Sequence, residues 1–549
     1  MTITSRNSHA NDTTALPAPG STSQLTSIIA WTVLLTVLGL VMLATMRSPE
    51  KDDIAWLLYV ARKWLAGQRL YTDLVEVNPP LIIWIYAIPA WIANAVGLPP
   101  KWLAVPGFAT MVLGAAWWTA NLLRDQGAIF ARRTPVFCAI GTLLLALPGV
   151  EFGQREHLMA ASVLPYLAGM AIWLNGGSLP RRQGIAVGVL AGLGCALKPT
   201  YGLAFVLPEL VGWLRHRPVL RAAPVAGVIA ALLYAVSILI FCPAFLDHAV
   251  PLALALYGGT DVTVLDLIQK ATSLLLGDAV LCMIWLLCYR HPNQRTSFAE
   301  AMFTVLMCFA LGATAVYFLQ GKNWFYHRIP AVVAVVLALM FWAADKLPSM
   351  ITDMSRAGAN FWPTARTLAC AFMALVSIGT LAFGEAVRMR PWIISAMEPE
   401  QSTEMRIEKI IRREHARTYL AFSEWIELGF PVVNNTGVVW TSRFDSMWAL
   451  RGEMWRVQED GKAPKEWPIR QWVARDFVKG CPDIAVVDAR GGINFVSYLI
   501  ASDTDFAKAW RHYRQIAMFD GLRVLKRQGD SCDDSKKPSR VVSAAMPSP

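Results

Sequence analysis

Long apolar runs separated by short polar segments repeat along residues 27–384 of the chain. A helix that crosses a membrane needs roughly 20 mostly apolar residues. The runs that meet this description are 27–46, 105–123, 134–150, 157–175, 222–242, 268–289, 299–319, 329–344 and 367–384. The apolar stretch 184–214 is interrupted by Lys198-Pro199, and a charge and a proline both resist the middle of a bilayer. It predicts two short spans with a turn between them, and the whole pattern predicts about eleven spans.

The run 79–96 is apolar as well, but it begins with Asn78-Pro79-Pro80 and contains Pro89. Lys and Arg are enriched in loops that remain in the cytoplasm. If the N-terminus is cytoplasmic and 79–96 does not span, the main basic clusters all fall on the cytoplasmic side. These clusters are 124–133, 181–182, 215–217, 290–295 and 346–366. We therefore expect 79–96 to form a juxtamembrane or re-entrant helix on the outer side.

This topology places four loops and a polar tail on the outer side, namely 47–104, 151–157, 243–267, 320–328 and 385–549. The tail is long enough for a domain of its own. It contains a strand-like run at 484–487, a helical stretch near 503–513 and an alternating run at 515–526, an order typical of a small α/β domain. We expect disordered ends at 1–25 and 536–549, a helical membrane region at 26–384 and an outer α/β domain at 385–535.

The amino-acid composition is also that of a polytopic α-helical membrane protein. Hydrophobic residues make up 55% of the 549 residues and charged residues only 16%, whereas soluble domains have about 25% charged residues. These values exclude a soluble enzyme on one small anchor, and they exclude a disordered chain. The net charge of +11 matches cytoplasmic loops rich in Lys and Arg, and no basic run or motif indicates a nucleic-acid partner.

The nine cysteines do not form a metal-binding pattern, because no group of Cys and His has zinc spacing. Most of them lie in or beside apolar runs, where cysteine acts as a small packing residue. Cys481 and Cys532 lie in the outer tail, where an oxidising compartment would permit a disulfide between them. The sequence leaves their distance in space open.

The first outer loop begins with an acid pair, Asp52-Asp53, followed by apolar residues at helical spacing. Two roles fit such a pair. The carboxylates can cap the helix and favour its dipole, or one of them can act as a general base at the membrane surface. Charges are scarce in this chain, so that a pair of them at one face is informative.

Further ionisable and aromatic residues occur in the other outer segments and in the turn of 184–214. They are Arg155, Glu156, His157, Lys198, Lys322, Tyr326, His327 and Arg328. Arg155, Glu156 and His157 form either a solvated turn with an internal Arg–carboxylate pair, or a second acid with a basic partner beside the first loop's acids. The others either anchor the protein at the membrane interface or bind a phosphate and a sugar or lipid headgroup. The tail contains another aromatic group, Trp440-Thr441-Ser442-Arg443-Phe444 with Trp448. These residues either contact a sugar acceptor or belong to the core of the outer domain.

Several motifs follow one another in a recognisable order. The acid pair after the first span is followed by an amphipathic helix with Gly67 and Tyr71, and then by Asn78-Pro79-Pro80-Leu81. The run from Gly188 to Lys198-Pro199 is similar to a GLxxLxKxP segment. This order resembles the GT-C superfamily of membrane glycosyltransferases, which includes the lipid A aminoarabinose transferases and the protein O-mannosyltransferases. The resemblance covers residues 27–384.

The resemblance implies a specific reaction. Such enzymes transfer a sugar from a polyprenyl-phosphate donor to an acceptor outside the cytoplasmic membrane, and the closest subgroup acts on envelope polysaccharides or lipids of bacteria. By position, the general base would be Asp52 with Asp53 as its neighbour, and the second-loop acid would be Glu156, where relatives usually have Asp. The lipid phosphate and sugar would be bound by Arg155, His157, Lys198, Lys322, Tyr326, His327 and Arg328.

The implied chemistry requires no cofactor, although Asp52, Asp53 and Glu156 would be able to bind a divalent metal ion. No Gly-rich nucleotide loop is present, which fits a lipid-linked donor. Three alternatives stay open: a membrane transporter, a ligase or polymerase of lipid-linked glycans, and a non-catalytic protein of envelope polysaccharide assembly. The sequence shows no internal repeat, and its conspicuous charges lie at one face, which disfavours the transporter.

Overall fold

The computed structural model describes residues 21–127, 129–216, 220–257, 262–289, 297–354, 361–529 and 532. Residues 1–20 and 536–549 of the two ends expected to be disordered lie outside the described residues. Helix α1 begins at Ser21, several residues before the predicted start of the membrane region. Once a helix has nucleated, adding residues at its end costs little, so the polar residues before the apolar run continue it.

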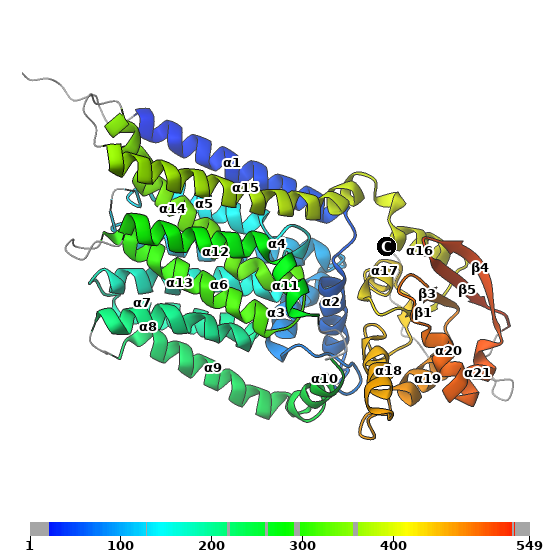
Figure 1. Ribbon diagram of the computed structural model, residues 1–549. Helices are drawn as coiled ribbons and strands as arrows, with labels where there is room; N and C mark the ends of the chain where they lie inside the picture. Colours follow the sequence, from blue (N-terminus) through cyan, green and yellow to red (C-terminus); the bar gives the residue numbers. More distant parts are fainter. Residues whose placement is uncertain are drawn as a thin grey trace, which may run out of the picture.

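Helices predominate in the described chain as far as Met397 and lie side by side as a bundle (Figure 1). Short 3-10 and π-helical turns between them carry the label η. The elements are α1 (Ser21–Arg47), α2 (Asp52–Leu65), α3 (Pro80–Val96), α4 (Lys101–Leu123), α5 (Arg133–Ala146), η1 (Gly149–Glu151), α6 (Arg155–Leu174), α7 (Arg181–Leu197), η2 (Pro199–Phe205), α8 (Val206–Arg215), α9 (Ala222–Phe241), η3 (Phe245–Ala249), α10 (Val250–Leu256), α11 (Val264–Lys270), α12 (Thr272–Ile284), η5 (Trp285–Tyr289), α13 (Phe298–Leu319), η6 (Phe325–Arg328), α14 (Ile329–Met354) and α15 (Phe361–Met397).

Eight helical segments of the described chain are long and apolar enough to cross a membrane. They are α1, α4, α6, α9, α12 with η5, α13, η6 with α14, and α15. The architecture is that of a multi-pass membrane protein, with fewer such helices than the sequence predicts, because α5, α7 and α8 are shorter than a full span. The predicted break at Lys198-Pro199 is present, since α7 ends at Leu197 and η2 leads into α8.

Helix α3 corresponds to the run 79–96 and is only 17 residues long. Contacts beyond α3 and within it connect the helix to segments at one end of the bundle. Beyond its C-terminus, Lys101 donates a hydrogen bond to the carbonyl oxygen of Ser48, which follows α1. Within it, the Tyr86 hydroxyl donates to the carbonyl oxygen of Gly153, which precedes α6. These contacts agree with a helix that lies along the end of the bundle.

The segments predicted to share one side of the membrane gather at that same end, against the C-terminal region (Figure 1). The N–H of Val75 donates to the carbonyl oxygen of Arg443, and the Asn434 side chain donates to the carbonyl oxygen of Ala55. Helix α15 continues to Met397, beyond the predicted end of the last span at residue 384. The charged residues of the loops therefore meet at the joint between the helical and C-terminal parts.

The C-terminal region contains a five-stranded sheet with the strand order β2-β1-β3-β5-β4. Strands β2, β1 and β3 are parallel, and β5 runs antiparallel to both β3 and β4. Its elements are η7 (Pro399–Gln401), α16 (Thr403–Arg413), β1 (Thr418–Phe422), η8 (Ile426–Leu428), α17 (Val432–Thr436), β2 (Val439–Trp440), α18 (Trp448–Asp460), α19 (Ile469–Gly480), β3 (Ile484–Asp488), α20 (Phe495–Ser502), α21 (Thr504–Trp510), β4 (Tyr513–Phe519) and β5 (Leu522–Arg527).

The strand predicted at 484–487 is β3, and it lies at the centre of the sheet. The alternating run 515–526 is a hairpin of two strands rather than one strand, because Asp520 and Gly521 both adopt positive φ and turn the chain between β4 and β5. Cys481 and Cys532 form a disulfide, the pairing that the sequence left open.

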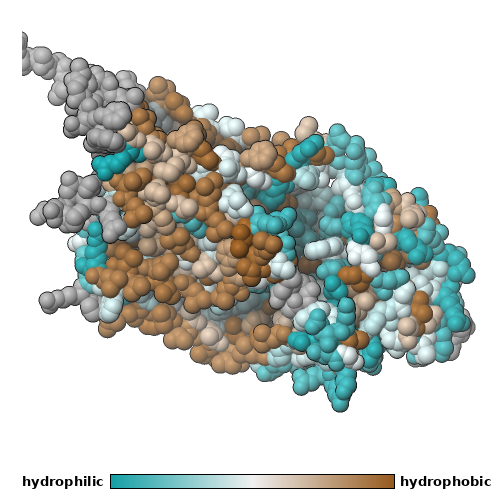
Figure 2. Space-filling view, viewed as in Figure 1, coloured by the Kyte–Doolittle hydropathy of each residue, from teal (hydrophilic) through white to brown (hydrophobic). Residues whose placement is uncertain are grey.

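The surface divides into two zones that follow this division of the chain. Figure 2 shows hydrophobic residues over the bundle and mostly hydrophilic residues over the C-terminal region. Helices α1 and α9 expose many large apolar side chains, including Leu35 and Leu232. An apolar surface of this extent fits contact with lipid rather than with water.

Helices α7 and α9 approach so closely that only glycine fits between them. A Cβ atom added at Gly188 would lie 2.1 Å from the carbonyl oxygen of Ala223, and one at Gly192 would lie 2.3 Å from that of Gly227. Small residues let helix backbones pack in membranes, where the hydrophobic effect does not drive helices together. This glycine face attaches the otherwise exposed α9 to the bundle.

We expect Gly192→Ala to destabilise the protein by about 1–3 kcal/mol, because its methyl group must push α9 away. Gly114→Ala in α4 is the matched control, since nothing lies within 4 Å of a Cβ there. Thermal unfolding of both variants in detergent measures the difference. Equal midpoints for the two variants would contradict the tight packing of α7 on α9.

Candidate active site at the joint between the bundle and the C-terminal region

Four segments that are distant in the sequence meet where the bundle faces the C-terminal sheet. They are the first turn of α2, the first turn of α6, the turn after α7, and η6. The approach to α6 requires a glycine. Gly153 has a φ of +98°, and a Cβ atom there would lie 2.6 Å from the ring of Phe108. This turn sets the direction in which the polar residues at the start of α6 project.

The two aspartates of the acid pair face different neighbours. Asp52 forms an ion pair with Lys51 at 2.7 Å and accepts the backbone N–H of Asp53. Asp53 accepts a hydrogen bond at 3.0 Å from the side chain of Gln154, the residue before α6. Burial and the charge of Asp52 raise the pKa of Asp53, while the positive charges of Lys51 and Arg155 oppose the rise. Asp53 is therefore the member of the pair that faces α6.

Two further carboxylates lie near Asp53. Glu76 is buried and accepts hydrogen bonds from the Trp56 indole at 2.5 Å and from the N–H of Asn78 at 2.6 Å. Asp445 belongs to the loop after β2, and burial together with the charges of Glu76 and Asp53 raises its pKa. Burial also raises the pKa of Glu76. The site thus has an acidic side built by α2, the segment before α3 and the C-terminal region.

Arg155 is the first residue of α6 and is only 9% exposed. Among the described residues its guanidinium donates no hydrogen bond and forms no ion pair, and its buried Nε has no partner. Asp53, Glu76 and Glu156 lie near enough to stabilise its charge. A buried cation at a helix N-terminus is a favourable place for an anion, because the helix dipole adds to its field.

Beside Arg155 lies a network of Glu156, Lys198 and His327. The Lys198 Nζ lies 2.5 Å from both Glu156 Oε1 and His327 Nε2. Because an ammonium group can only donate, this geometry assigns the proton of neutral His327 to Nδ1, which has no partner among the described residues. The second oxygen of Glu156 is also buried without a partner. The network therefore keeps one donor, the Nδ1–H of His327, and one acceptor, the second oxygen of Glu156, for a ligand.

Aromatic rings form a wall between this network and the C-terminal region. Tyr326 packs on His327 and lies 5.6 Å from the Nζ of Lys198. Trp324 packs on both Tyr326 and Tyr257. The Tyr257 ring in turn packs on Trp448 of α18, with ring centroids 5.2 Å apart. Lys322 donates a hydrogen bond at 2.6 Å to the carbonyl oxygen of Tyr257 and holds this wall in place.

The structure brings most of the predicted site residues together. Asp53, Arg155, Glu156, Lys198, Lys322, Tyr326 and His327 surround one region.

Asp52, His157 and Arg328 lie outside this region. Asp52 is paired with Lys51. Both ring nitrogens of His157 bond to the backbone, one to the N–H of Gly153 and the other to the carbonyl oxygen of Leu144. Arg328 donates to the carbonyl oxygen of Lys270, at the end of α11. His157 thus orients the turn before α6.

Four members of the site are not assigned by the sequence patterns: Gln154, Glu76, Tyr257 and Asp445. Glu76 had a usable signal, since it lies two residues before the Asn78-Pro79-Pro80 motif. Asp445 lies directly after the run Trp440–Phe444, in which Trp440 and Phe444 prove to be buried. An isolated carboxylate of this kind is recognised only when the C-terminal region is placed against the bundle.

A metal ion was one of the possibilities left open by Asp52, Asp53 and Glu156. In the part of the chain that the structure describes, no group of three His, Cys, Asp or Glu side chains is arranged to hold one. Arg155 and Lys198 lie among the carboxylates instead.

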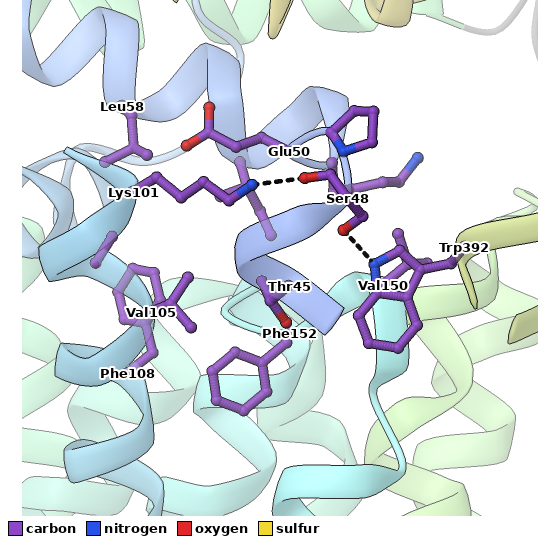
Figure 3. A pocket seen from close by; sticks show the side chains of 14 residues that line it. Thr45, Ser48, Glu50, Leu58, Lys101, Val105, Phe108, Val150, Phe152 and Trp392 are labelled. Carbon is purple, nitrogen blue, oxygen red and sulfur yellow. Dashed lines mark hydrogen bonds between the residues drawn. The ribbon is translucent and has the colours of Figure 1, made fainter. Parts of the chain in front are cut away.

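A small pocket lies beside α2, between the segment that follows α1 and helix α4 (Figure 3). Its volume is about 20 Å³, enough for a water molecule, and Ile54, Leu58 and Phe152 contribute to its lining. Lys101 and Trp392 both donate hydrogen bonds to Ser48 in its wall. The pocket is too small for a sugar, and these bonds tie α4 and α15 to the segment that leads into α2.

No protein-family model matches this chain, and no curated protein is significantly similar to it in sequence. A functional assignment therefore rests on the residues of the site and their geometry.

Glu151 in the turn before α6 gives a test of the electrostatics at this joint. Burial raises its pKa from 4.5 to about 7. The folded protein therefore binds the proton of Glu151 more tightly than the unfolded chain does. Proton binding stabilises the fold at low pH, and this stabilisation is lost as the pH rises from about 4.5 to about 7. Glu151→Gln stays neutral, so we expect its Tm to exceed that of the wild type by about 2 °C at pH 8 and to match it near pH 5.

The matched control is Glu459→Gln, at an exposed position near the end of α18. It should follow the wild-type Tm at every pH. A Glu151→Gln variant with the same pH profile as the wild type would show that Glu151 is not shielded from water.

Proposed function

We propose that the protein is a glycosyltransferase that transfers a sugar from a polyprenyl-phosphate donor to an envelope glycan or glycolipid, on the outer face of the bacterial cytoplasmic membrane. The observation that carries the proposal is the buried Arg155, which has no anionic partner among the described residues and lies close to Asp53. A phosphate leaving group needs such a cation, and an acceptor hydroxyl needs such a base.

The chemistry assigns one role to each side of the site. Asp53 takes the proton from the acceptor hydroxyl, whose oxygen forms a bond to the anomeric carbon of the donor sugar. The bond between that carbon and the phosphate oxygen breaks, and the electron pair leaves with the polyprenyl phosphate. Arg155 stabilises the negative charge that develops on this phosphate. Lys198 provides a second positive charge beside Arg155, because its ammonium group is bound to Glu156, the next residue of α6.

Asp53 is better suited to be the base than Asp52, the residue that the family resemblance favours. Its raised pKa gives it a greater affinity for a proton, whereas Asp52 is held by the ammonium group of Lys51 at 2.7 Å. Asp53 also faces Gln154 beside Arg155, so that the base lies next to the proposed phosphate site.

A lipid-linked donor has a fitting groove on the bundle. An open groove of about 990 Å³ is lined mainly by apolar residues of α3, α7 and α9, among them Leu81, Trp84 and Leu233. At one end it reaches Leu81, close in sequence to Glu76 of the site, and Tyr234, whose hydroxyl accepts the N–H of Leu81. An isoprenoid chain in this groove would leave its phosphate near the start of α6.

The test compares the two aspartates directly. Purified wild type, Asp53→Asn and Asp52→Asn are incubated with a panel of polyprenyl-phosphate sugars and envelope glycolipid extract, and release of polyprenyl phosphate is followed. We expect loss of the base in Asp53→Asn to lower kcat by about 10²–10⁴-fold, and Asp52→Asn to retain most of the activity. A stable Asp53→Asn variant with wild-type turnover would remove Asp53 from the mechanism.

A second variant separates donor binding from proton transfer. Arg155→Gln should weaken binding of polyprenyl phosphate itself, the product, by about tenfold or more, because a buried charged hydrogen bond is lost. Asp53→Asn should still bind this lipid. Arg182→Gln, at an exposed position near the start of α7, is the control for loss of a positive charge. Unchanged lipid binding by Arg155→Gln would contradict the phosphate site.

A further inference from the structure

The loop between β2 and α18 reaches from the C-terminal region into the acidic side of the site. The N–H of Val75 donates a hydrogen bond at 2.8 Å to the carbonyl oxygen of Arg443, and Val75 and Phe444 pair as an isolated parallel bridge. The residue after Val75 is Glu76, and the residue after Phe444 is Asp445. This backbone contact holds the two carboxylates beside each other.

The loop is anchored on its other side as well. Arg443 forms a two-point ion pair with Asp476 of α19, at 2.8 and 2.9 Å, and the backbone N–H of Arg443 donates to the same carboxylate. The Phe444 ring is fully buried. Asp445 accepts the N–H of Ser446 at 2.6 Å, which fixes the direction of its carboxylate. The loop is therefore a preorganised element with a defined orientation.

Asp445 and Trp448 frame the space next to the proposed catalytic groups. The carboxylate of Asp445 lies near enough to Asp53 and Glu76 for their charges to act on it. Trp448 packs against Tyr257, which belongs to the aromatic wall beside Lys198 and His327. A carboxylate next to an aromatic face is a common way to bind a sugar, because the carboxylate accepts hydrogen bonds from hydroxyls and the ring packs on the C–H face.

Resting on the proposed function, we infer that the loop 441–448 of the C-terminal region is the acceptor-binding element of the site, with Asp445 accepting hydrogen bonds from the hydroxyls of a saccharide acceptor. Arg155 at the start of α6 and Lys198 after α7 bind the anionic donor. The acidic side repels a second anion and favours a neutral acceptor with several hydroxyl groups. Asp445 is thus a specificity-determining residue for the acceptor and does not bind the donor phosphate.

The experiment measures polyprenyl-phosphate release while the concentrations of donor and of envelope glycolipid extract are varied separately. We expect Asp445→Asn to raise the extract concentration for half-maximal release by about tenfold, as for loss of a buried hydrogen bond, with an unchanged KM for the donor. Asp445→Glu should restore part of the affinity. Asp505→Asn, at an exposed position on α21, should leave both values as in the wild type.

An increase in the donor KM of Asp445→Asn, or an unchanged dependence on the extract, would overturn the assignment while the transferase activity of the wild type stood. A wild type without any release would contradict the proposed function instead.

A binding measurement tests the loop without turnover. A thiol reagent is used to label Asp445→Cys in the presence of extract or of polyprenyl phosphate alone. Protection by the extract and not by polyprenyl phosphate is expected. Protection by neither would contradict acceptor binding at this loop, and protection by polyprenyl phosphate alone would place Asp445 on the donor side.

Discussion

The structure of the site depends on a buried positive charge, that of Arg155, which forms no ion pair with any residue that the structure describes. A guanidinium removed from water is costly unless nearby charges or a ligand compensate for it. Arg155 is 91% removed from solvent, and the carboxylates of Asp53, Glu76 and Glu156 lie around it without binding it directly. They supply enough negative potential to hold the cation in place, and they leave its donors available for an anion.

The same balance gives the C-terminal region a part in the site. The loop after β2 adds Asp445 to the acidic side and joins the backbone at Val75. The interface is held by polar contacts to the backbone, such as the bond from Asn434 to Ala55 and that from Arg456 to Ala255. Aromatic side chains pack across the same joint, because Phe430 contacts Trp56 and Tyr59 of α2 and Trp448 contacts Tyr257. The polar contacts add a fixed orientation, which suits a joint that must position carboxylates within one site.

The sequence predicts the elements that depend on local patterns. Apolar runs identify the long helices, Lys198-Pro199 identifies the break after α7, and the run 484–487 identifies β3, because periodicity and proline act over a few residues. Which of Asp52 and Asp53 faces α6 was not predictable, since it depends on Gln154, about a hundred residues away. The same limit applies to Asp445, and to His157, whose ring bonds to the backbone of Gly153 and Leu144. Contacts between distant segments leave no periodic signal.

The proximity of Arg155 to Asp53 couples the two halves of the proposed reaction. The positive charge of Arg155 lowers the proton affinity of Asp53 in the empty site. When an anionic phosphate pairs with Arg155, that influence is offset, and the negative charge of the phosphate adds to those of Asp52 and Glu76. The proton affinity of Asp53 must then rise. Donor binding would in this way make the base stronger at the moment when an acceptor hydroxyl is to be deprotonated, and the empty site would hold a weaker one.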